Sequence, residues 1–156
     1  MTGDKEFLFS VYASTRADEM NLVDWDTSRK ESFLRAQFKL QDQYYKANYS
    51  DALYQAILMD GQPIGRLYID RKAEEIRIMD IALLPEYRGQ GIGSHLLKQI
   101  LEEATTKNLP VTIHVERFNP ALHLYERLGF CLAEDKGVYL FMKWSPPVLE
   151  QHENAR

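Results

Sequence analysis

Cysteine is nearly absent from this sequence, because Cys131 is the single cysteine among 156 residues. One cysteine excludes an internal disulfide, and no Cys/His spacing resembles a zinc site, so no metal is expected. No histidine lies close to Cys131 in the sequence. It is therefore expected to be a small, buried strand residue rather than a nucleophile.

Long apolar runs and an N-terminal targeting pattern are absent as well. No apolar stretch approaches the length that spans a bilayer, and charged residues follow Met1 closely, unlike in a signal peptide. Basic residues are not in excess, since the formal net charge is -4 and the sequence pI is about 5.6. This balance does not favour binding to duplex nucleic acid. We expect a cytoplasmic protein with no membrane and no nucleic-acid partner.

The residues that are present have an ordinary globular composition, with 45% hydrophobic and 27% charged residues in a length that suits one domain. No repeat, low-complexity tract or linker divides the chain. We predict a single domain over residues 1–144, followed by a polar tail over residues 145–156 that carries Pro146-Pro147 and no apolar period.

Hydrophobic periodicity changes from helical to strand-like near residue 50. Helices are predicted from Thr2 to Met20 and from Asp26 or Thr27 to about Asn48. A hairpin follows at Asp60-Gly61, and a later helix is expected to start with Asn119 as N-cap and to end before Gly129. The other predicted elements are strands 53–59, 64–70 and 76–84, helix 91–106, and strands 111–116, 130–134 and 138–143. Hairpins and helix crossovers together predict an α/β fold with a mixed sheet flanked by helices.

The most specific segment joins the strand that ends near Leu84 to the following helix through Arg88-Gly89-Gln90-Gly91-Ile92-Gly93. A helix start leaves several backbone amides without partners and carries a partial positive charge. Glycines let an anion approach these amides closely, and Arg88 adds a charged donor. The loop therefore suits a pyrophosphate.

Other glycine-rich patterns fit this loop less well. A P-loop requires a Lys and then Ser or Thr after its last glycine, and no such Lys follows Gly93. A dinucleotide fingerprint requires Gly-x-Gly-x-x-Gly near the first strand of a βαβ unit, whereas here Gly-x-Gly-x-Gly follows a hairpin. A helix start that uses glycine only for close packing stays open as an alternative.

Three segments occur in a characteristic order around this loop. They are Asp80-Ile81-Ala82-Leu83-Leu84-Pro85, the loop itself, and Asn119-Pro120-Ala121-Leu122-His123-Leu124-Tyr125-Glu126-Arg127-Leu128-Gly129-Phe130. They resemble the fourth strand, the Gln/Arg-x-x-Gly-x-Gly/Ala signature and the second common block of the GNAT superfamily of acyl-CoA-dependent N-acetyltransferases. The resemblance covers about Leu53 to Trp144. It implies the GNAT fold, with a mostly antiparallel mixed sheet, and transfer of an acetyl group from acetyl-CoA to a primary amine.

The chain departs from the family at its start. Family members usually begin with a strand, but here the helical pattern starts almost at Met1, so that strand is expected to be missing or very short. One sheet edge would then be open and could pair with a second copy in a homodimer.

The resemblance implies acetyl-CoA as the co-substrate. Its pantetheine arm would lie along Ile81, Ala82 and Leu83, with Asn119 as a further contact on the pantetheine side. Asn119 is explained at least as well as a helix N-cap, and one side chain can do both. The pyrophosphate would be held by the loop and the first helical residues, which are Arg88, Gly89, Gln90, Gly91, Ile92, Gly93 and Ser94.

The resemblance also implies direct attack by the acceptor amine in a ternary complex. Tyr125 matches the family's general-acid tyrosine, since a phenol with a pKa of about 10 can protonate a departing thiolate. Packing in the core is the alternative role for Tyr125. His114 is a candidate general base because imidazole titrates near physiological pH. Glu116, Asp80, Glu75 and an ordered water stay open as alternatives.

The acceptor, a small-molecule or peptide amine, is not identified by the sequence. The resemblance places its site at the first two helices and the final hairpin, which here means Asp24, Trp25, Asp26, Tyr44, Tyr45, Tyr49 and the turn Asp135-Lys136-Gly137. Acidic and aromatic groups suit a cationic amine. A non-catalytic acyl-CoA sensor and a purely structural protein are the alternative functions.

Overall fold

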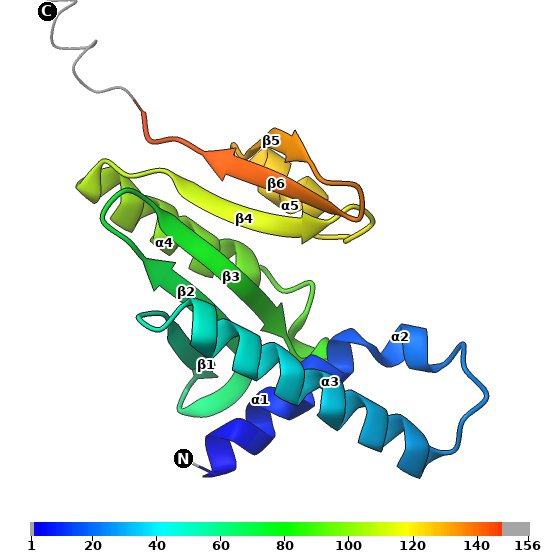
Figure 1. Cartoon of the computed structure of the whole chain (residues 1–156). Coiled ribbons are helices and arrows are strands. Elements are labelled where there is room, and N and C mark those ends of the chain that lie inside the picture. Colours follow the sequence, from blue (N-terminus) through cyan, green and yellow to red (C-terminus); the bar gives the residue numbers. More distant parts are fainter. Residues whose placement is uncertain (1, 148–156) are drawn as a thin grey trace, which may run out of the picture. The chain divides into compact units, whose positions relative to one another are not determined.

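The computed structural model describes residues 2–147 and has the predicted α/β architecture (Figure 1). Its elements are α1 (Thr2–Thr15), α2 (Ala17–Met20), α3 (Thr27–Asn48), β1 (Leu53–Met59), β2 (Gln62–Arg71), β3 (Ile76–Leu83), the 3-10 helix η1 (Pro85–Tyr87), α4 (Ile92–Lys107), β4 (Val111–Glu116), α5 (Leu122–Arg127), β5 (Cys131–Asp135) and β6 (Tyr139–Trp144). Within residues 2–147, six strands form one sheet in the order β1-β2-β3-β4-β6-β5. The β3–β4 pair is parallel, whereas β1–β2, β4–β6 and β5–β6 are antiparallel. A mixed, mostly antiparallel sheet flanked by helices is therefore confirmed.

The described residues divide into two compact units, one made of residues 2–70 and 80–93 and the other of residues 71–79 and 94–147. Each unit is described by itself below. The single domain over residues 1–144 stays a prediction, and most of the predicted tail, residues 148–156, lies outside the described residues.

Helices α1 and α3 form the helical part of the first unit. Aromatic contacts hold them together, with the Phe9 and Phe38 rings 5.7 Å apart and Tyr12 equally close to Phe38. Asp26 caps α3 as predicted, since its Oδ1 accepts a hydrogen bond from the Arg29 amide at 2.7 Å. The predicted first helix is interrupted at Arg16, which separates α1 from α2.

Within residues 2–147, the first strand of the sheet comes after the helices α1 to α3. Within residues 2–147 no strand precedes α1, so β1 lies at one edge of the sheet and β5 at the other.

In the second unit, α5 ends as the sequence predicts. Gly129 has a φ of 104°, in the left-handed region that favours glycine. The amides of Gly129 and Phe130 donate to the carbonyl oxygens of Glu126 and Tyr125, which is the Schellman pattern of helix termination.

The predicted start of α5 is wrong. The helix begins at Leu122 with Ala121 as its cap residue, and Asn119 is not the N-cap. Asn119 instead closes a turn ahead of the helix, because its Oδ1 accepts from the Ala121 amide at 2.8 Å and its carbonyl accepts from the Leu122 amide. The short Asx turn, favoured by Asn, delays the regular helix.

Cys131 also differs from its prediction, since it is exposed rather than buried. All residues of β5 are exposed, because this strand lies at the sheet edge. The predicted boundaries of β5 and β6 are each one residue too early.

Candidate functional site

The loop between β3 and α4 has the backbone that its glycines suggest. Gly89 and Gly91 have φ values of 73° and 82°, which residues other than glycine rarely adopt. Gly93 lies inside α4, and a Cβ placed on it would meet no atom within 4 Å. The amides at the start of α4 are among those that a helix leaves without internal partners. A loop of this kind can bind an anion close to its backbone.

Arg88 joins three parts of the first unit. Its Nε donates to the carbonyl oxygen of Leu83 at 2.9 Å, and its Nη2 donates to Ser14 Oγ of α1 at 3.3 Å. The neighbouring Gln90 donates to the Glu86 carbonyl at 2.8 Å. Ser14 was not among the predicted site residues, and no sequence pattern marks it, because it lies 74 positions from Arg88.

The predicted pantetheine strand, Ile81, Ala82 and Leu83, is half-buried at the end of β3. Next to it, Asp80 forms an ion pair with Arg66 of β2, and Arg66 is only 1% exposed. Asp80 is therefore already engaged with a buried cation. This limits its role as one of the alternative bases.

A small polar network surrounds Arg66. The guanidinium also donates to Gln41 Oε1 at 3.2 Å and lies over the Tyr68 ring at 4.7 Å. Burial raises the pKa of Tyr68 to about 12, although the guanidinium opposes that rise. The sequence indicated this arrangement, because Arg66 lies two residues from both Ile64 and Tyr68 in the strand. Side chains at that spacing point to the same face of the sheet.

In the second unit, Tyr125 is 4% exposed and its ring lies edge-on to Phe130, with centroids 5.7 Å apart. Packing therefore fixes the ring of this candidate acid. The other cofactor candidates in this unit are Ser94, in the first turn of α4, and Asn119, in the turn before α5.

His114 lies on the exposed face of β4. Its ring is 4.8 Å from that of Phe141, and Lys136 Nζ is 3.3 Å from its Nε2. Partial burial lowers the pKa of His114 below its ordinary value, and the nearby cations Arg77 and Lys136 lower it further, against Glu134 and Glu75. A lowered pKa favours the neutral imidazole, which can accept a proton.

The remaining candidate bases differ in their surroundings. Glu116 is half-buried on β4, at the same parity as His114. Glu75 accepts hydrogen bonds from Arg77 and from Thr112 at 3.0 and 3.1 Å, so its carboxylate belongs to a local network.

Among the candidate acceptor residues, Tyr45 packs against Tyr44 and Tyr49, with ring centroids 6.1 and 6.2 Å apart. Trp25 packs on Phe33 and on the guanidinium of Arg29, 4.2 Å from its ring. Tyr45 and Tyr68 have ring centroids 5.8 Å apart, edge to face. These contacts are typical of local packing, so aromatic content alone did not locate an acceptor site.

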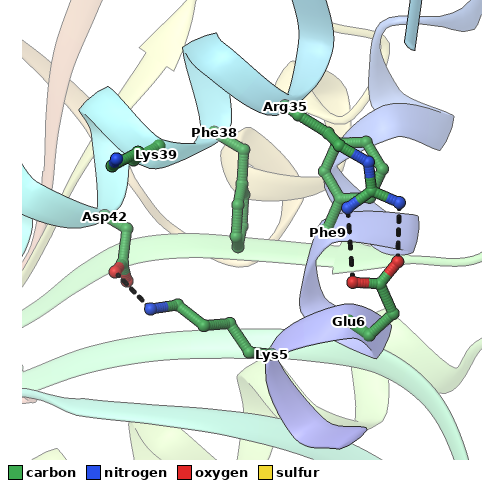
Figure 2. A pocket seen from close by; sticks show the side chains of 7 residues that line it. All are labelled: Lys5, Glu6, Phe9, Arg35, Phe38, Lys39 and Asp42. Atoms are coloured by element: carbon green, nitrogen blue, oxygen red, sulfur yellow. Dashed lines mark hydrogen bonds and ion pairs between the residues drawn. The ribbon is translucent and has the colours of Figure 1, made fainter. Parts of the chain in front are cut away.

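A pocket of about 240 Å³ opens between α1 and α3 (Figure 2). Phe9 and Phe38 line it, while Glu6 pairs with Arg35 on one side. Lys5 pairs with Asp42 at 3.5 Å, and the remaining lining residue is Lys39. The pocket contains none of the predicted site residues, and its charged groups are mostly paired with one another.

No helix within residues 2–147 has the length and apolar character needed to cross a membrane. No group of three or more potential metal ligands occurs in that range either.

Comparison with known proteins places this geometry in context. The model of the acetyltransferase (GNAT) family matches residues 18–130. A mycothiol acetyltransferase from Thermobifida fusca is 32% identical over 84 residues, which are 53% of this chain and 23% of that protein. A ribosomal protein bS18-alanine N-acetyltransferase from Haemophilus influenzae is 31% identical over 75 residues, or 47% of this chain and 51% of that protein. The chain thus spans about half or less of the length of these curated relatives.

The fold is shared with solved structures. The PaiA N-acetyltransferase from Thermoplasma acidophilum, in complex with coenzyme A, superposes with a TM-score of 0.67 over 90% of this chain and 92% of that chain, at 22% identity. The family match covers most of the sequence, including the glycine loop and Tyr125. The chain belongs to the acetyltransferase (GNAT) family.

Proposed function

We propose that this chain is an N-acetyltransferase that moves an acetyl group from acetyl-CoA to a primary amine in a ternary complex. The observation that carries the proposal is the loop that opens α4, with left-handed Gly89 and Gly91 and an unobstructed Gly93. Acetyl-CoA supplies a thioester, which is the reactive group of the reaction. A structure of a family fold with coenzyme A bound supports this choice of donor.

Donor binding is assigned to two stretches of backbone. The amides from Gly89 to Ser94 would bind the pyrophosphate, helped by the partial positive charge of the helix start. Ile81, Ala82 and Leu83 would hydrogen-bond the pantetheine arm as an added strand does. Asn119 is proposed as a further contact, and its turn-forming bond to Ala121 holds the side chain in one orientation.

The chemical step needs two proton transfers. The amine nitrogen bonds to the acetyl carbon as the carbon–sulfur bond breaks, so the amine loses one proton and the thiolate gains one. We assign the first transfer to His114, directly or through a water, because its lowered pKa favours the neutral imidazole. We assign the second to Tyr125, whose ring is held by Phe130.

The acceptor is proposed only as a class, a small-molecule or peptide amine. One relative is named for mycothiol and another for a ribosomal-protein alanine, so the family includes both kinds. A homodimer through the open β1 edge, the cytoplasmic location and the absence of a nucleic-acid partner stay predictions.

A non-catalytic acyl-CoA sensor is the second candidate. The burial of Tyr125 against Phe130 favours it, because a core residue of this kind needs no catalytic role. The two candidates share the donor site and differ in what Tyr125 does.

Release of CoA from acetyl-CoA, measured over a panel of small amines and peptides, separates the two candidates. The enzyme requires an added amine, and Tyr125→Phe should lower kcat by about 100-fold while the Kd for acetyl-CoA is unchanged. Binding of acetyl-CoA without turnover on any amine, or full activity in Tyr125→Phe, would contradict the assignment.

A further inference from the structure

Gly65 is a buried glycine in the middle of β2, a position where glycine has no obvious advantage. Its φ is not in the left-handed region, so any residue could adopt its backbone conformation. Glycine in a strand interior weakens the strand and usually marks a close approach of another backbone. The glycine is therefore explained by the lack of room for a side chain at this position.

The space above Gly65 is filled by the end of β3. A Cβ on Gly65 would overlap the carbonyl oxygen of Ala82 and would lie 2.9 Å from Leu83 Cδ2 and 3.1 Å from Leu83 Cα. Two of these three atoms belong to the backbone, so no change of rotamer could relieve the contact. An alanine here would have to push the Ala82–Leu83 segment away from β2.

Hydrogen bonds next to the Ala82–Leu83 segment hold it in place. The Leu84 amide donates to the Ile64 carbonyl at 2.9 Å, which ties the two strands together one residue further on. On the loop side, Arg88 Nε donates to the Leu83 carbonyl at 2.9 Å. The backbone of Ala82 and Leu83 is thus held close to β2 only because residue 65 has no side chain.

We propose that Gly65 is a positioning residue for the donor: the missing side chain places the backbone of Ala82 and Leu83 where it can hydrogen-bond the pantetheine arm. This inference rests on the proposed function, which assigns those residues to pantetheine. It adds a residue that touches neither the donor nor the reacting atoms but decides where the binding strand lies.

The test compares two ligands by isothermal titration calorimetry. CoA contacts both the loop and the strand, whereas 3′-phospho-ADP has the pyrophosphate and lacks the pantetheine arm. Gly65→Ala should weaken CoA binding by about tenfold or more, an effect of about 1.4 kcal/mol, and change 3′-phospho-ADP binding far less. A general loss of structure would weaken both ligands alike.

The control is Ile69→Val in the same strand, at a fully buried position that pairs with Leu53 of β1. It should lower the unfolding temperature and leave the ratio of the two affinities unchanged. Equal weakening of both ligands in Gly65→Ala, or no weakening of CoA binding, overturns the inference. If the wild-type protein binds neither ligand, the proposed function fails and the inference fails with it.

A crystal structure of the wild-type protein with CoA tests the inference without any variant. The expected result is a pantetheine hydrogen bond to Ala82 or Leu83, with the Ala82 oxygen still less than 3.0 Å from an ideal Cβ on Gly65, a separation that real Cβ atoms essentially never show. A bound structure in which that Cβ would have ordinary contacts of 3.4 Å or more would overturn the inference, because alanine would then fit.

Discussion

At the scale of single residues, His114 shows how neighbours set the chemistry of a side chain. Its imidazole lies against Phe141 and beside Lys136, with Arg77 also near, so the protonated form is disfavoured by burial and by two positive charges. Glu134 and Glu75 oppose this effect only in part. The result suits a group that must be neutral before the amine attacks.

Lys136→Met should raise the pKa of His114, because it removes the cation 3.3 Å from Nε2. A histidine whose folded pKa lies below its unfolded value of about 6.5 contributes stability above that value and loses it as the pH falls through the folded pKa. The variant should therefore lose less stability on acidification. The pKa is measured by NMR titration of the imidazole nitrogens, with Lys107→Met of α4 as control. An unchanged or lower pKa in Lys136→Met would contradict this account.

At the scale of secondary-structure elements, strands β2 and β3 are joined by the Arg66–Asp80 ion pair. The two partners are unequal, because the Arg66 side chain is 2% exposed and that of Asp80 is 22% exposed. Water can reach the carboxylate when its partner is lost, but it cannot reach the guanidinium. Within residues 2–147, Arg66 Nε is moreover buried without a hydrogen-bond partner. The buried cation therefore depends on the partners of its other two nitrogens, Asp80 among them.

Asp80→Ala should therefore cost about 3–5 kcal/mol in the free energy of unfolding, because it leaves a buried charge uncompensated. Arg66→Met should cost less, and the double variant should be more stable than Asp80→Ala alone. Urea denaturation measures all three, and Lys107→Met, which breaks a more exposed pair with Glu103, should change stability by less than about 1 kcal/mol. A larger loss in Arg66→Met than in Asp80→Ala would show that the buried guanidinium is not the costly partner.

Local patterns predicted most element positions but not the contacts between distant elements. Asp60-Gly61 and Gly129 marked a hairpin and a helix end through backbone conformations that few residues adopt, and both predictions are confirmed. In α3, the apolar residues Phe33, Leu40 and Tyr44 share one broad side of the helix with the buried Leu34 and Phe38, yet each of these three is exposed. An apolar stripe wider than the partner surface leaves some of its members outside, and the sequence does not state the width of that surface.

The geometry of the candidate site was predictable to the extent that it depends on consecutive residues. The loop from Arg88 to Gly93 could be found because its geometry follows from local glycines and a helix start. The contacts of Arg88 with Ser14, and of Gly65 with Ala82, bring together segments far apart in the sequence. Within a single sequence, no spacing rule relates such residues.

At the scale of the whole molecule, the proposed donor and acceptor sites are supported to different degrees. The family match over residues 18–130 includes the loop, β4 and Tyr125, whereas α1 and the β5–β6 hairpin lie outside it. The proposed acceptor residues are distributed inside and outside that match, and their contacts are local. The family match therefore supports the proposed donor, acetyl-CoA, more than any proposed acceptor.

The most direct measurement is calorimetric titration of acetyl-CoA into the wild-type protein and into Gly93→Leu. Gly93 is the suitable position because its φ is not left-handed and a Cβ meets no atom within 4 Å, so the variant should fold, whereas Gly89 and Gly91 would add backbone strain. Gln99→Leu, at an exposed position of the same helix, is the control. The account predicts that the wild-type protein and Gln99→Leu bind acetyl-CoA and that Gly93→Leu, with an undiminished unfolding temperature, does not. Failure of the wild-type protein to bind, or equally tight binding by Gly93→Leu, would contradict it.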